Sequence, residues 1–152
     1  MQKTDPTFTV SEVAAIVGKP VETIKTWRKK HYFPIEERGG WRRFTLKELF
    51  GVMVFAEVSS STVSYQFASM GAALAEQAFN EITRAEGVVP YLVGADSPEF
   101  GDLTELVYGV EQVSWQIGKL VGSNQNYGAY AVIDYASIFH RLLARLADKE
   151  DS

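Results

Sequence analysis

The stretch of sequence that decides the fold is FTVSEVAAIVGKPVETIKTWRKKHYFPIEERGGWRRFTLKELF, residues 8–50. It predicts two short helices joined by a tight Gly-Lys-Pro turn at 18–20. Glycine can end a helix in the left-handed conformation, and proline suits the first position of the next helix. We expect the first helix to begin after Val10 with Ser11 as its N-cap, and the second to span residues 21–31.

The second of these helices has one apolar and one polar face. Val21, Ile24 and Trp27 or Arg28 recur at helical spacing, which predicts a face that points into the core. The opposite face combines hydroxyl-bearing and charged side chains, namely Glu22, Thr23, Lys25, Thr26, Lys29 and Lys30. Such a helix can present hydroxyl and ammonium groups to base edges and phosphates in the major groove of DNA, although an ordinary solvated face has the same composition.

The segment after the second helix predicts a basic hairpin. Residues 32–45 contain a proline, two adjacent glycines and the run Trp41-Arg42-Arg43-Phe44, which is typical of a hairpin with glycines in its turn. Trp41 and Phe44 would anchor this wing. Arg42 and Arg43 would reach the DNA backbone or the minor groove, or stack on the aromatic rings of the hairpin.

A third helix is predicted over residues 46–58. Thr45 and Glu48 have the spacing of a capping box at its start. Most of the residues that follow are apolar, so we expect this helix to be largely buried. The Ser/Thr run at 59–62 ends the helix and marks a domain boundary.

Residues 63–86 predict one amphipathic helix of about six turns. Its apolar positions recur every three or four residues, at Val63, Phe67, Met70, Leu74, Ala78 and Ile82. Small residues lie between 71 and 75, so another helix could approach closely. That helix could belong to a second subunit or to the C-terminal part of the same chain.

The rest of the chain mixes strand and helix patterns. Residues 88–94 predict a strand that Pro90 places at a sheet edge, and residues 103–121 favour a helix despite a strand-like alternation at 113–117. A loop at 123–128, a strand at 129–135 and a helix at 138–149 follow. The inward residues of this last helix would be Ile138, Leu142, Leu143 and Leu146.

These patterns predict an α+β protein in three segments. Residues 1–58 would form a winged helix-turn-helix, residues 59–86 a long amphipathic helix for linkage or dimerisation, and residues 87–152 a small acidic α/β domain for dimerisation or for a ligand or partner.

The charge of the chain is unevenly distributed. The net charge is −4, but residues 1–58 hold ten Lys/Arg against seven Asp/Glu, whereas residues 59–152 hold five against twelve. Residues 19–43 alone hold eight cations against three acids. The basic segment coincides with the predicted helix-turn-helix and wing, which favours contact with double-stranded DNA.

The amino-acid composition excludes several classes of functional site. The absence of cysteine excludes disulfides, thiolate metal sites and cysteine nucleophiles, and His31 and His140 are too far apart in sequence to suggest a metal site. No apolar run is long enough for a membrane span and no signal-peptide core is present, so we expect a cytoplasmic, nucleoid-associated protein. No catalytic or phosphate-binding motif occurs, and we expect neither an enzyme nor a cofactor.

Two features of the acidic half have alternative interpretations. Its aromatic residues could line a ligand pocket, but core packing or a dimer interface is the favoured interpretation; they are Tyr91, Phe100, Tyr108, Trp115, Tyr127, Tyr130 and Tyr135. The acids Asp96, Glu99 and Asp102 lack a defined companion spacing, which favours a solvated loop over a divalent-ion or acid/base site.

The N-terminal third resembles the winged helix-turn-helix of the MerR family of bacterial transcription regulators. The resemblance is carried, in order, by Glu12-Val13-Ala14, Gly18, Thr23-Ile24-Lys25-Thr26-Trp27, Phe33-Pro34 and Gly40-Trp41-Arg42-Arg43-Phe44-Thr45. The sequence departs from the family pattern at four places: Lys25 replaces an arginine, Thr26 an aromatic residue, Arg28 an acid and His31 a glycine.

The resemblance implies a sequence-specific DNA-binding regulator, bacterial or phage-borne, that binds a two-fold symmetric operator as a homodimer. The expected DNA contacts are Thr23, Lys25, Thr26, Arg28, Lys29, Lys30, Arg42 and Arg43, with Trp27, Trp41 and Phe44 as anchors. Two alternatives remain open at this point. One is an excisionase-like architectural or recombination factor, and the other is a protein-interaction module whose winged helix has lost DNA binding.

Overall fold

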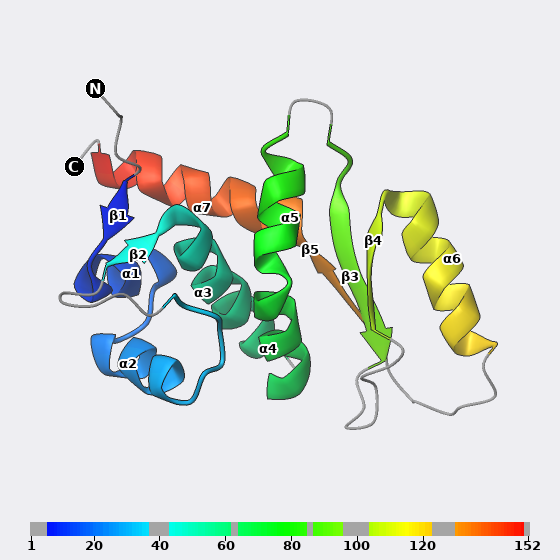
Figure 1. The fold of residues 1–152 in the computed structure, drawn as a ribbon, viewed down its shortest axis with the longest axis horizontal. Helices are drawn as coiled ribbons and strands as arrows, with labels where there is room; N and C mark the ends of the chain where they lie inside the picture. Colours follow the sequence, from blue (N-terminus) through cyan, green and yellow to red (C-terminus); the bar gives the residue numbers. More distant parts are fainter. Residues whose placement is uncertain are drawn as a thin grey trace.

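The computed structural model describes residues 6–36, 43–61, 64–84, 87–95, 104–122 and 130–150. The protein combines helices with a two-stranded and a three-stranded sheet, which confirms the predicted α+β class. Helices α1 and α2 lie at one end of the molecule, the three-stranded sheet and α6 at the other, and α7 runs back from the sheet toward α1 (Figure 1).

Helix α1, Val10–Val17, starts earlier than expected. Its N-cap is Thr9, whose hydroxyl accepts a hydrogen bond from the Glu12 N–H at 3.2 Å, while the Glu12 carboxylate accepts one from the Thr9 N–H at 3.0 Å. The prediction of Ser11 as the N-cap was wrong because Thr9 and Glu12 satisfy two helix-end N–H groups reciprocally, which Ser11 followed by Ala14 cannot do.

The turn between the first two helices forms as predicted. Gly18 has φ 80° and its N–H donates to the Ala14 carbonyl, so it caps α1 in the left-handed conformation. Pro20 is the N-cap of α2, Val21–Lys29, and not its first helical residue. The helix also ends two residues before the predicted boundary, because His31 takes a positive φ of 57° that no helix interior can contain.

The strand before α3 pairs with the N-terminus of the chain. Strand β2, Phe44–Thr45, is antiparallel to β1, Thr7–Phe8. The sequence predicted a hairpin over residues 32–45, and the described part of its first half, residues 32–36, forms no strand. The remainder of the hairpin, residues 37–42 with Gly39, Gly40, Trp41 and Arg42, lies outside the described residues.

Helix α3, Leu46–Ser59, is the centre of the core. The predicted capping box between Thr45 and Glu48 is present, with hydrogen bonds of 2.8 Å and 3.1 Å. All residues from Leu49 to Ala56 are buried, as expected from their apolar sequence. Because α1, α4, α5 and α7 all pack against it, α3 fixes the position of the helix-turn-helix relative to the rest of the protein.

The predicted long helix over 63–86 is interrupted. The structure has α4, Tyr65–Ala73, and α5, Ala75–Ile82, with Leu74 between them at φ −94° and ψ 0°. The Tyr135 hydroxyl donates a 2.7 Å hydrogen bond to the Gly71 carbonyl in the last turn of α4. Carbonyls at a helix end lack partners within the helix, so a buried phenol from another segment stabilises this break.

The small residues of this region pack within the chain. A Cβ at Gly71 would lie 2.4 Å from Ile133 Cδ1, and Gly71, Ala72 and Ala75 are buried against their surroundings. Of the two arrangements considered for the small residues, the structure therefore shows packing against the same chain.

The three-stranded sheet has the order β4-β3-β5 and is antiparallel throughout. Strand β3, Pro90–Ala95, is central, so the prediction of an edge strand was wrong. Pro90 is tolerated because it is the first residue of the strand. Residues 105–108 form β4, Glu105–Tyr108, and not the start of a helix; Gly109, with φ 89°, then allows the turn into α6, Val110–Val121.

The chain ends in β5, Tyr130–Asp134, followed by α7, Tyr135–Glu150. Ile138 and Leu142 are buried as expected, but Leu143 is 42% exposed and its predicted inward orientation was wrong. Phe139 takes its place, since it lies one residue after Ile138 on the face that meets Phe50 and Phe79. The predicted loop at 123–128 lies outside the described residues.

One hydrophobic core joins residues from both halves of the sequence. It extends from Val13 and Phe55 in the N-terminal part to Leu92 and Leu142 in the C-terminal part. The buried core thus continues across the boundary predicted after Val58, and the three-segment division remains a prediction. Among the described residues, no helix is long and apolar enough to cross a membrane.

Candidate nucleic-acid interface

Helix α2 is anchored to the core by two buried side chains. Ile24 is fully buried and Trp27 is 8% exposed. The Trp27 ring meets the Phe55 ring edge-on, with centroids 4.8 Å apart. Trp27 therefore attaches α2 to the core, and it fixes which face of α2 is turned to solvent.

The solvent face of α2 contains most of the predicted DNA contacts. Glu22, Lys25, Thr26, Lys29 and the adjoining Lys30 are exposed. The Thr26 hydroxyl donates to the Glu22 carbonyl at 2.9 Å, and Lys25 Nζ lies 3.7 Å from the Glu22 carboxylate. Both contacts are local and exposed, so they hold Thr26 and Lys25 on one face and leave both side chains accessible from solvent.

Two predicted contact residues lie on the flanks of this face. Thr23 and Arg28 are half-buried, between the anchored side of α2 and the exposed side. Their position allows contact with a groove wall more readily than with its floor, because a helix in the major groove points its outermost side chains at the base edges.

The end of α2 has an unusual backbone geometry. His31, exposed, adopts φ 57°, and the Lys30 ammonium lies 5.9 Å from the centroid of the Tyr32 ring. A positive φ favours glycine, which is the residue that the family pattern has at this position. His31 therefore holds a left-handed backbone conformation that glycine would adopt more easily.

The wing residues that the structure describes are held by the N-terminal strand. Arg43 Nε donates to Thr7 Oγ1 at 2.6 Å, its Nη2 donates to the Thr7 carbonyl at 3.1 Å, and Nη2 lies 3.8 Å from Glu12 Oε1. The Arg43 side chain is 49% exposed. Phe44 is fully buried. Trp41 and Arg42 lie outside the described residues.

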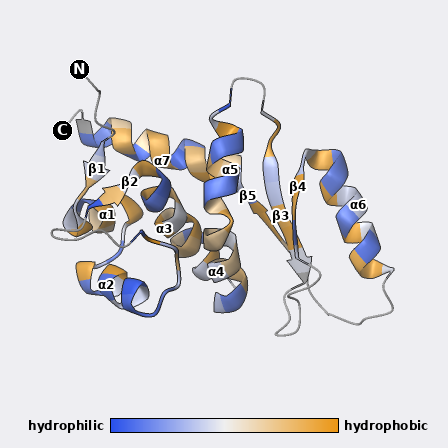
Figure 2. Cartoon of the chain, viewed as in Figure 1, coloured by the Kyte–Doolittle hydropathy of each residue, from blue (hydrophilic) through white to orange (hydrophobic). Residues whose placement is uncertain are grey.

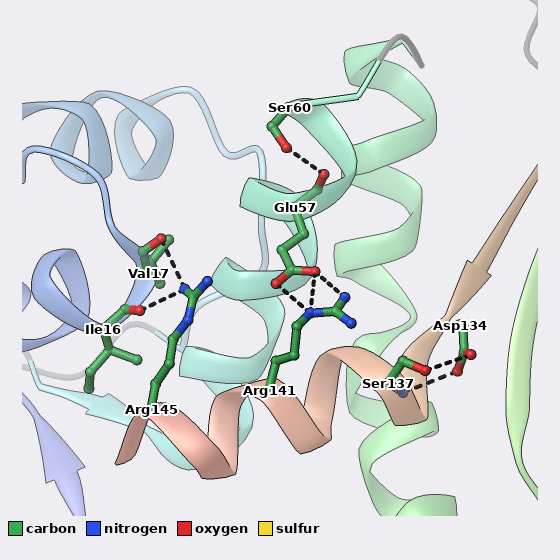
Figure 3. Close-up of polar contacts among 8 residues, drawn as sticks. All are labelled: Ile16, Val17, Glu57, Ser60, Asp134, Ser137, Arg141 and Arg145. Carbon is green, nitrogen blue, oxygen red and sulfur yellow. Dashed lines mark hydrogen bonds and ion pairs between the residues drawn. The ribbon is translucent and has the colours of Figure 1, made fainter. Parts of the chain in front are cut away.

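Three cations of α7 contact the helix-turn-helix and α3, which the sequence interpretation missed; two of them are drawn in Figure 3. Arg145 Nη1 donates to the Ile16 carbonyl at 2.9 Å, at the C-terminal end of α1. Arg141 forms a two-pronged ion pair with Glu57 of α3 (Figure 3). Arg141, Arg145 and Lys149 are spaced four residues apart, so they share one face of α7; this spacing was the available signal.

The third cation, Lys149, meets Glu12 at the start of α1. Its Nζ lies 3.1 Å from Glu12 Oε2. The hydrogen bond from the Thr9 N–H, and then the contact with Lys149, lower the pKa of Glu12 to about 2. Glu12, at the start of α1, thus contacts both Arg43 before β2 and Lys149 at the end of α7.

The ligand pocket and the ion site that were weighed as alternatives for the acidic half are not seen in the part of the chain that the structure describes. Among those residues, no three His, Asp or Glu side chains are grouped as a metal would require. The aromatic residues of the acidic half do not converge on one pocket: Tyr135 is buried in the main core, whereas Trp115 is 61% exposed. Phe100, Tyr127 and the acids Asp96, Glu99 and Asp102 lie outside the described residues.

The fold and the exposed basic helix define a helix-turn-helix protein. Residues 8–49 match the family model described as MerR HTH family regulatory protein. The N-terminal region is therefore similar to the helix-turn-helix of MerR regulators, and the match supports a DNA-binding transcription regulator. No relative was found among curated proteins.

Proposed function

We propose that the protein is a sequence-specific transcription regulator that binds a two-fold symmetric DNA site as a homodimer, with α2 as the recognition helix. The observation that carries the proposal is the two-sided construction of α2. Its inner face is anchored by Ile24 and Trp27, while Lys25, Thr26 and Lys29 are held together on the outer face. A rigid helix with outward hydroxyl and ammonium groups fits a major groove about 12 Å wide.

The outer face divides naturally into backbone contacts and base contacts. Lys25, Lys29 and Lys30 supply charge for phosphates, which fixes position without reading sequence. Thr26 and Glu22 are the groups suited to base edges, since a hydroxyl can both donate and accept and a carboxylate can accept from the cytosine N4 amino group. Glu22 is 86% exposed and lies beside Thr26 on this face.

The wing supplies a second contact in this proposal. Arg42 and Arg43 would meet the backbone or the minor groove beside the recognition helix. The bonds from Arg43 to Thr7 position the guanidinium group, and its 49% exposed side chain retains surface for a phosphate. Replacing both arginines by alanine should weaken binding to all sequences alike.

Two experiments test the proposal. Bound fragments are first selected from random DNA, and the affinity for the selected duplex is then measured by fluorescence anisotropy over a salt series. Each phosphate that a cation neutralises adds about 0.9 to the slope of log K against log salt. Changing Lys25, Lys29 and Lys30 together to alanine removes three such cations from each subunit, so the slope for a dimer should fall by about 5. The matched control is Arg84→Ala, an exposed cation on another segment, which should leave the slope unchanged.

Base readout requires a different variant. Thr26→Ala should change the sequence preference in the selection while leaving the salt slope nearly unaltered. Salt-independent binding by the unmodified protein would refute DNA recognition and favour a protein-interaction module. Strong bending of the selected duplex in a gel-mobility assay, without sequence preference, would instead indicate an architectural factor.

A further inference from the structure

Helix α6 has more apolar surface than its own sheet covers. Val113 and Ile117 pack around Leu120, which is 1% exposed, on the side that meets the sheet. Val110, Trp115 and Val121 remain 67%, 61% and 61% exposed. Figure 2 shows apolar colouring at both ends of α6, at the extremity of the molecule. With 3.6 residues per turn, Val110 and Val121 lie on one flank of α6 and Trp115 lies on its outer side, all outside the single apolar stripe that a surface helix normally carries. Their exposure indicates a second contact.

The sheet beneath α6 also has an uncovered strip. Val93 packs with Leu120 beneath α6, and Val132 of β5 pairs with Val93 across the sheet. Directly opposed residues point to the same face, so Val132 lies on the α6 side. Helix α6 packs on β3 and β4, and Val132 and Tyr130 of β5 are left 44% and 38% exposed.

We propose that this α6–β5 surface, formed by Val110, Trp115, Val121, Tyr130 and Val132, binds a second copy of the chain across a two-fold axis, with the two α6 helices antiparallel. The inference rests on the homodimer of the proposed function and assigns its interface. Two-fold symmetry covers the apolar residues of each copy with the same residues of the other copy, as an isologous interface requires.

The charges on α6 favour a second copy over another partner. Glu111 lies near the start of the helix and Lys119 near its end, and both are exposed. About 12 Å of helix axis separates them, so they cannot pair within one helix. Antiparallel packing brings Glu111 of each copy beside Lys119 of the other, and the same pair forms twice. Within the chain, Lys119 instead lies over the Trp115 ring at 4.6 Å.

The middle of α6 leaves room for this approach. Ser114 and Gly118 lie one turn apart between Val110 and Val121, and a Cβ at Gly118 would have no other atom within 4 Å. Helix α2 lies at the opposite end of the molecule from α6 (Figure 1), so the interface leaves both recognition helices exposed. The two half-sites would then be widely separated on the DNA.

Multi-angle light scattering of the full-length protein over a concentration series tests the interface. The unmodified chain should show a dimer, and Val121→Lys or Trp115→Lys should weaken dimerisation about tenfold or more. Leu143→Lys is the matched control because Leu143 is an exposed apolar residue on α7, outside the α6–β5 surface. Unchanged circular dichroism shows that each variant is folded.

Charge exchange tests the antiparallel arrangement. Glu111→Lys and Lys119→Glu should each weaken the dimer, and the double variant should restore it. A monomeric unmodified chain, equal loss in Leu143→Lys, or no rescue in the double variant would overturn the inference. Anisotropy on a single half-site, which a monomer can bind through α2, reports on DNA recognition separately. Failure of the interface and failure of the proposed function are therefore distinguishable.

Discussion

Replacing Tyr135 by phenylalanine tests how the break between α4 and α5 is stabilised. Tyr135 is fully buried, and its hydroxyl donates to the Gly71 carbonyl at 2.7 Å. The substitution keeps the ring and its contact with Phe50, whose centroid is 6.2 Å away, and removes only the donor. The buried Gly71 carbonyl then has no donor at the end of α4.

The expected loss follows from this desolvated carbonyl. A buried acceptor left without a partner costs about 1–3 kcal/mol, so the free energy of unfolding should fall by about 2 kcal/mol. For a chain of this size the melting temperature should fall by about 6 °C. Tyr65→Phe is the matched control, because Tyr65 is 50% exposed and its hydroxyl can bond to water in both states.

The same variant has a signature at alkaline pH. Burial raises the pKa of Tyr135 above its ordinary value. The unfolded phenol ionises near pH 10 while the native one stays protonated, so the native state binds more protons and stability falls as pH rises. Above about pH 10 this group should cost about 1.4 kcal/mol of stability per pH unit, and Tyr135→Phe should remove that dependence.

Urea denaturation followed by circular dichroism measures both effects. The two variants and the unmodified protein are compared at about pH 7 and across the pH range around the phenol's ordinary pKa of about 10. The account is refuted if Tyr135→Phe matches Tyr65→Phe in stability near neutral pH. It is also refuted if the alkaline loss persists in Tyr135→Phe, because another group would then be responsible.

Three further predictions concern single residues. His31→Gly should raise the free energy of unfolding by about 1 kcal/mol, because glycine relieves the left-handed backbone at φ 57°; a decrease in urea melts would contradict this. The Thr9 N–H and Lys149 lower the pKa of Glu12 to about 2. The ionised carboxylate should therefore add about 1 kcal/mol to the free energy of unfolding at pH values above its unfolded pKa of 4.5, and this contribution should be lost as the pH falls from 4.5 toward 2. In Glu12→Gln, acid titrations should show this component missing. Gln116→Leu should stabilise the protein by about 1 kcal/mol in thermal melts, since the buried Gln116 Oε1 has no hydrogen-bond partner among the described residues.

The helix-turn-helix could be recognised from the sequence because its signals are local. Gly18 ends α1 and Thr45 and Glu48 form their capping box, both as predicted, and Trp27 is buried against the core. Each of these features depends on residues within one or two helical turns, where the spacing along the chain fixes the spacing in space. The outer face of α2 followed from the same periodicity.

Other features needed contacts between distant segments. No local pattern indicated that β2 pairs with residues 7–8, that Pro90 opens a central strand, or that Tyr135 caps the end of α4. The local sequence pattern of a strand or helix is compatible with several partners. Tertiary packing determines which strands pair and which buried hydrogen bonds form, as in the one that joins residues 64 positions apart.

By itself, then, the sequence determined the class of the N-terminal region and the face of α2 that meets solvent, because helix caps and apolar periodicity act over three or four residues. Only the tertiary structure decided how that region is held. Arg141, Arg145 and Lys149 of α7 find distant partners, 84, 129 and 137 residues away, in Glu57, Ile16 and Glu12. Such pairs form only where the folded core brings two helices side by side, and no spacing along the chain encodes that distance.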